Sequence, residues 1–102
     1  MKHHFMGRAR DGYGNIQINQ QISVYFTSTT SAAPLYENYE DVIPITSAPQ
    51  ITTNLEGLFS FYVDDVEINP TQLFDIECQG ITYERVDIFK GSWWNPKKWF
   101  LL

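Results

Sequence analysis

The chain has 102 residues, enough for one domain with a single core and too few for two. Hydrophobic residues make up 43% of it and charged residues 19%, a balance that excludes disorder throughout. The net charge is −5, and because positions 11–84 hold eleven acidic residues and no Lys or Arg, most of the surface is unsuited to nucleic acid.

The first half of the chain predicts one long strand between irregular segments. Residues 1–6 show no clear period, so we interpret them as an N-terminal arm or a short leading strand. Three glycines and an Asp-Gly pair predict a tight turn within residues 7–15. Apolar and polar residues alternate from Ile16 to Phe26, which predicts a half-buried strand. Residues 34–37 are expected to form a short edge strand, followed by a long acidic connection over residues 38–50.

The second half predicts two hairpins. Residues 51–63 carry two apolar stretches separated by the Asn54–Gly57 turn, with Phe59, Phe61 and Val63 on one face. Residues 73–89 alternate again around a Gln79-Gly80 turn. No helical period persists for ten residues. We therefore predict an all-β fold, a small antiparallel β-sandwich of about seven short strands over residues 7–89, with an aromatic C-terminal extension over residues 90–102.

The order of these signals resembles a known sandwich family. The resemblance rests on four segments: Gly7-x-Ala9-x-Asp11-x-x-Gly14-Asn15, Ile22-Ser23-Val24-Tyr25, Thr53-Asn54-x-x-Gly57-x-Phe59-Ser60-Phe61 and Phe74-Asp75-Ile76-x-x-x-Gly80-Ile81. Together they resemble the transthyretin-like, carboxypeptidase-regulatory-like sandwich, which is also Ig-like in architecture. In that family the segment matching Thr53–Phe61 crosses from one sheet to the other. The resemblance implies that Phe59 and Phe61 fill the space between the sheets.

A narrower resemblance concerns one part of that pattern. Ile22–Thr29 followed by Ala33-Pro34-Leu35-Tyr36-Glu37 is similar to modules in virion proteins of tailed bacteriophages, such as tail or neck fibres and head decorations. The chain departs from that pattern at Ser28, where the modules have Gly, and at Asn38, near their Asp. The resemblance implies a structural protein of the virion.

Several clusters of polar side chains are candidates for metal binding or catalysis. Asp64, Asp65, Glu67 and Asn69 offer the oxygen ligands that calcium takes, but their spacing lacks the features of an EF-hand, so a solvated acidic turn is preferred. The second acidic cluster, in the 37–41 segment, lies in a proline-flanked loop without a partner base. No phosphate-binding glycine loop or nucleophile elbow is present. We expect no catalytic residues, no metal and no cofactor.

Three further side chains have a structural interpretation. His3 and His4 are adjacent, so on an extended chain they point to opposite faces and do not share a metal; we assign them to a mobile end or a subunit contact. Cys78 is the only cysteine and lies in a strand pattern, which favours core packing over nucleophilic chemistry. The sequence also lacks an apolar run long enough to span a bilayer and a signal-peptide stretch, so we expect a soluble, non-exported chain.

The C-terminal extension is the most conspicuous candidate site. Left exposed, its apolar side chains would form a large patch of the kind that marks an interface. Docking on a neighbouring subunit is favoured, folding back onto the sandwich is the main alternative, and membrane-surface contact, opposed by the acidic body, is the third. The candidate interface residues are Trp93, Trp94, Lys97, Lys98, Trp99, Phe100, Leu101 and Leu102.

These observations lead to one preferred hypothesis. The chain is expected to be a non-enzymatic virion component of a tailed phage, assembled in the host cytoplasm in many copies or as a homo-oligomer. Its partners would be tail, portal/neck or capsid subunits, with neither nucleic acid nor membrane as a partner. The alternative is a carbohydrate- or ligand-binding sandwich module, because aromatic side chains stack on flat ligand faces. A transthyretin-like hydrolase is disfavoured because the body lacks the basic residues for its cleft.

Overall fold

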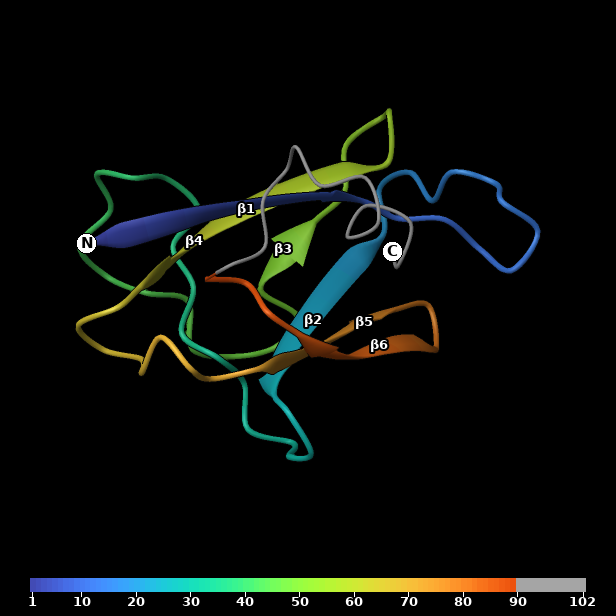
Figure 1. Cartoon of the computed structure of the whole chain (residues 1–102). Helices are drawn as coiled ribbons and strands as arrows, with labels where there is room; N and C mark the ends of the chain where they lie inside the picture. The colour runs from blue at the N-terminus through green and yellow to red at the C-terminus, as the bar shows by residue number, and fades with distance from the viewer. Residues whose placement is uncertain (90–102) are drawn as a thin grey trace.

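The computed structural model describes residues 1–89, which form two antiparallel sheets. One sheet pairs the first and fourth strands, and the other has the strand order β3-β2-β5-β6. Figure 1 shows the β1–β4 pair above the layer that contains β2, β5 and β6. The strands are β1 (Lys2–Arg8), β2 (Gln21–Phe26), β3 (Ile51–Thr52), β4 (Leu58–Asp64), β5 (Phe74–Cys78) and β6 (Ile81–Val86).

The core lies between the two sheets, as the alternating sequence predicts. In β4 every second residue is buried, and Phe59, Phe61 and Val63 share the inner face. Phe5 on β1 lies beside them, with its ring centroid 5.4 Å from that of Phe61. Ile76 of β5 faces these rings from the opposite sheet and is fully buried. The predicted all-β, small antiparallel sandwich is confirmed, with six strands in the described residues.

The first strand begins earlier than residue 7, where we had placed the start of the sandwich. Residues 2–8 pair along their whole length with β4, from Lys2 opposite Asp64 to Arg8 opposite Leu58. Of the two interpretations of residues 1–6, the leading strand is therefore the one observed, and the N-terminal arm is not. Alternation between buried and exposed side chains is irregular at His3 and His4, which is why the sequence period is weak there.

The turn after β1 is confirmed, but the strand that follows starts later than predicted. Asp11 Oδ1 accepts hydrogen bonds from the amides of Tyr13 and Asn15, and Gly14 has a positive φ of 86°. The chain then returns beside β1, where the Gln17 amide donates to the Ala9 carbonyl at 2.9 Å. Ile16 therefore belongs to this return and is 42% exposed, and β2 begins only at residue 21.

The predicted first hairpin is wrong in its pairing. β3 pairs with β2 and β4 pairs with β1, so residues 53–57 carry the chain from one sheet to the other. Asn54 stabilises this crossing because its Oδ1 accepts from the amides of Glu56 and Leu58. Gly57 has φ 74°, and a Cβ there would lie 2.2 Å from the Ile16 side chain.

The second hairpin is confirmed. β5 and β6 pair antiparallel around Gln79 and Gly80, which both have positive φ, as two-residue hairpin turns require. The paired region ends at Val86 instead of continuing to Phe89. A register shift between Phe74 and Ile76 accompanies this early end.

The connection between β2 and β3 is long, as predicted, and is attached to both sheets. Leu35 is fully buried and forms a bridge with Ile45, and Tyr36 forms a bridge with Tyr62 of β4. The predicted edge strand over residues 34–37 is thus reduced to isolated bridges. Gln50 is the last residue of this connection. Its side-chain amide is buried and forms hydrogen bonds with the backbone of Val24 and Ala33.

Candidate functional site

The eight interface residues predicted from the sequence, Trp93 to Leu102, lie outside the described residues. The structure does place the point where their segment begins. The Phe89 ring meets the His3 ring edge-on at 5.1 Å and lies 6.2 Å from the Phe74 ring. Phe89, the last described residue, therefore lies beside the first residues of β1.

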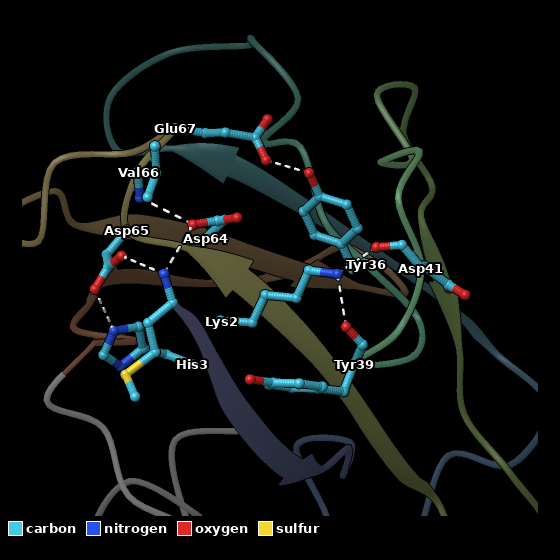
Figure 2. A network of polar contacts seen from close by, with 10 residues as sticks. Lys2, His3, Tyr36, Tyr39, Asp41, Asp64, Asp65, Val66 and Glu67 are labelled. Atoms are coloured by element: carbon cyan, nitrogen blue, oxygen red, sulfur yellow. Dashed lines mark hydrogen bonds and ion pairs between the residues drawn. The ribbon is translucent and has the colours of Figure 1, made fainter.

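A network of polar contacts surrounds Lys2 at the start of β1 (Figure 2). Its Nζ donates to the carbonyl of Tyr39 at 2.6 Å and to the carbonyl of Asp41. The same ammonium group lies 4.1 Å from the centroid of the Tyr36 ring, within the range of a cation–π contact. One lysine thus attaches the 36–41 loop to the edge of the two-stranded sheet.

Tyr36 extends this network toward the turn after β4. Its hydroxyl donates a hydrogen bond to Glu67 Oε1, as Figure 2 shows. This bond, together with desolvation and the nearby negative charge, raises the pKa of Tyr36 to about 12. Tyr36 is therefore held as the neutral phenol, which makes it a hydrogen-bond donor and not a base at neutral pH.

The acidic turn considered for calcium has other partners. The amino nitrogen of Met1 lies 2.8 Å from Asp65 Oδ1 and 3.4 Å from Asp64 Oδ1. His3 Nε2 lies 2.9 Å from Asp65 Oδ2. The hydrogen bonds from Met1 and His3 lower the pKa of Asp65, and the Val66 amide does so for Asp64. Across residues 1–89, no group of three or more His, Cys, Asp or Glu side chains is placed to hold a metal ion.

The two histidines occupy opposite faces of β1, as predicted, but they do not belong to a mobile end. His3 contacts Asp65 and Phe89, whereas His4 stacks on Tyr62 with a centroid distance of 4.6 Å. Tyr39 meets the Tyr62 ring edge-on at 5.8 Å, so three rings form a strip on the outer face of the sheet. Partial desolvation lowers the pKa of His4 and so favours its neutral form.

The other polar candidates are structural. Asp41 accepts from the amide of Asn38 at 3.0 Å and so closes the turn within the 37–41 acidic segment. Cys78 is 6% exposed and belongs to the core cluster, as predicted, and burial raises the pKa of its thiol. Neither group lies beside an activating base among its described contacts.

A groove that the sequence did not predict lies between β3 and the edge of β4 that faces away from β1. It encloses about 460 Å³. It lies beside the crossing over residues 53–57, because Asn54 of the crossing and the adjacent Leu58 are among its lining residues. The only sequence signal was the Asn54–Gly57 turn, which marks one end of it. The lining residues are Met6, Glu37, Asn38, Gln50, Ile51, Thr52, Asn54, Leu58, Phe59 and Ser60.

The groove is suited to a polar ligand. Hydroxyl, amide and carboxylate side chains line it, together with the apolar side chains of Met6, Ile51, Leu58 and Phe59. Gln50 is not available to a ligand, because its amide is bonded within the fold. Glu37 is the charged group of the lining, so a neutral or cationic ligand is favoured over an anion.

Comparison with known proteins finds no matching family model, no matching curated protein and no matching solved structure. No helix of the described chain is long and apolar enough to cross a membrane.

Proposed function

We propose that the chain is a non-enzymatic structural component of a tailed-bacteriophage virion. It docks on neighbouring tail, portal/neck or capsid subunits through its C-terminal extension, and it is present in many copies. The similarity of residues 22–37 to phage virion modules supports the virion assignment. The transthyretin-like motif order supports the finer family assignment of the sandwich.

The observation that carries the docking role is the position of Phe89. Its ring contacts His3 near the start of β1, so the described chain ends beside the two-stranded sheet. Three Trp, one Phe and two Leu follow within the last twelve residues, with two lysines among them. Aromatic anchors surrounded by charged groups are the usual composition of a protein interface.

The test is incorporation into particles of the phage that encodes the chain. Full-length protein with Trp99→Ala and Phe100→Ala is expected to fold normally and to be lost from purified particles by at least tenfold. Tyr13→Ala is the matched control, because Tyr13 is 93% exposed in a turn of the body. Equal incorporation of the tail variant and the wild type would reject the docking role.

A carbohydrate- or ligand-binding module is the second candidate, and the groove between β3 and β4 is the observation that favours it. Neutral oligosaccharides titrated into the full chain would then shift the amide resonances of Thr52 and Ser60. Glu37→Ala is expected to weaken such binding, whereas Glu84→Ala, on exposed β6, is the control. Absence of shifts at millimolar oligosaccharide would reject this candidate.

A further inference from the structure

The groove between β3 and β4 presents hydroxyl groups from both sheets. Thr52 of β3 is exposed and Ser60 of β4 is half-buried, and both residues line the groove. Two amide side chains of the lining, those of Gln50 and Asn54, are bonded within the fold. The hydroxyl groups of Thr52 and Ser60 both donate and accept hydrogen bonds, so they match a ligand that is rich in hydroxyl groups.

The apolar contacts that the groove offers come mainly from Met6 and Leu58. These two side chains are half-buried, whereas Ile51 and Phe59 are buried, with only 8% and 3% of their surface exposed. Aliphatic contacts of this kind suit the C–H groups of a sugar ring. The volume of about 460 Å³ also lies within the range of sites for small ligands.

The charge of the groove is negative. Glu37 is an exposed carboxylate of the lining, and Glu40 follows it in the same loop. Lys2, which holds this loop, donates to two backbone carbonyls and not to a carboxylate. All described lining residues except Met6 belong to positions 11–84, which contain no Lys or Arg. A cationic group is therefore attracted to the groove, and an anionic group is repelled.

We propose that the groove binds an amino sugar. The ammonium group of the sugar pairs with the Glu37 carboxylate, and the ring hydroxyls bond to Thr52 and Ser60. Hydrogen bonds to an ionised carboxylate are about twice as strong as bonds between neutral groups, so the amine adds affinity that a neutral sugar lacks. This inference rests on the ligand-binding candidate of the proposed function, whose ligand class it names, and it is independent of the virion assignment.

Three β-1,4-linked trisaccharides test this inference on the full chain. Those of glucosamine, N-acetylglucosamine and glucose differ only in the group at the second carbon of each ring. Their dissociation constants are measured at low ionic strength from the amide shifts of Thr52 and Ser60. The glucosamine trisaccharide is expected to bind at least about fivefold more tightly than the two neutral ones. Added salt is expected to reduce this ratio, because Glu37 is exposed and its charge is screened.

Glu37→Gln is the decisive variant. It removes the charge but keeps an oxygen that accepts hydrogen bonds, so we expect the three dissociation constants to agree within about twofold. Glu40→Gln is the matched control, because Glu40 lies in the same exposed loop but does not line the groove. This control is expected to keep most of the preference for the glucosamine trisaccharide.

The outcomes separate the ligand class from the ligand-binding function itself. Equal affinities for the three trisaccharides in the wild type, or a preference that survives Glu37→Gln, would overturn the amino-sugar assignment and leave a site for neutral carbohydrate. Tighter binding of a glycine–lysine–glycine tripeptide with blocked ends, at the same amides, would overturn it in favour of a peptide ligand. Absence of shifts with every trisaccharide at millimolar concentration would reject the ligand-binding candidate as well.

Discussion

The two faces of the β1–β4 sheet are built from different chemistry. The inner face carries Phe5, Phe59 and Phe61, whose rings pack at centroid distances between 5.4 and 6.3 Å. The outer face carries Lys2 and His4, which contact a loop and a ring instead of the core. Apolar burial on the inner face stabilises the whole domain, whereas the bonds on the outer face determine where one loop lies.

Among the variants that test this difference, Phe61→Ala is expected to have the largest effect on the free energy of unfolding. Phe61 is fully buried between the sheets, so its removal leaves a cavity that the surrounding side chains fill only in part. We expect the free energy of unfolding to fall by about 3–5 kcal/mol, measured by urea denaturation. Tyr13→Ala, which removes an exposed ring, is expected to change it little. Comparable losses in the two variants would contradict the assignment of the core.

Gln50→Leu tests the buried side-chain amide of Gln50. The variant keeps the volume but removes the bonds that Gln50 makes to the Val24 amide and the Ala33 carbonyl, whereas the Val24 carbonyl still accepts from the Ala33 amide. Buried groups left unpaired cost free energy, so we expect a loss of about 2–4 kcal/mol in the same denaturation experiment. Gln21→Leu on an exposed position of β2 is the control. A neutral Gln50 variant would show that water replaces the amide.

Lys2→Met tests the outer face. Loss of its bonds to the Tyr39 and Asp41 carbonyls is expected to lower the free energy of unfolding by less than about 1 kcal/mol, because these two hydrogen bonds are partly exposed to solvent. The amides of residues 39–41 are nevertheless expected to show faster exchange and lower order parameters by NMR. Arg10→Met, which removes a donor to the Gly14 carbonyl, should leave this loop unchanged. A large global loss would place Lys2 among the core-stabilising residues.

The smallest effect concerns the Tyr36–Glu67 bond. In Glu67→Gln the negative charge is removed, so the pKa of Tyr36 is expected to fall from about 12 toward its ordinary value, as an ultraviolet titration would show. Because the folded pKa is raised, the stabilisation by this bond is present below about pH 10 and is lost as the pH rises toward 12. Glu56→Gln in the exposed crossing turn is the control. An unchanged pKa would exclude Glu67 as its cause.

The inner face could be predicted from the sequence and the outer face could not. Alternation at Phe59, Phe61 and Val63 predicted the core because burial follows the two-residue period of a strand. The turn signal at Asn54–Gly57 did not show that β3 and β4 belong to different sheets, since a local turn has the same sequence pattern whether its flanking strands pair or diverge. The crossing was implied only by the family resemblance of residues 53–61. The two hydrogen bonds of Lys2 join residues 37 or more positions apart, and no local sequence pattern predicts such pairings.

The register of the two-stranded sheet has a consequence for how the chain folds. Each pair between β1 and β4 joins residues separated by at least 50 positions, from Arg8 with Leu58 to Lys2 with Asp64. Closing so long a loop costs conformational entropy before the contacts between the strands contribute favourable free energy. Topologies of this kind therefore fold slowly. During synthesis β1 is completed well before its partner strand exists. The β5–β6 hairpin, by contrast, closes locally, and we expect it to form ahead of the sheet that contains β1.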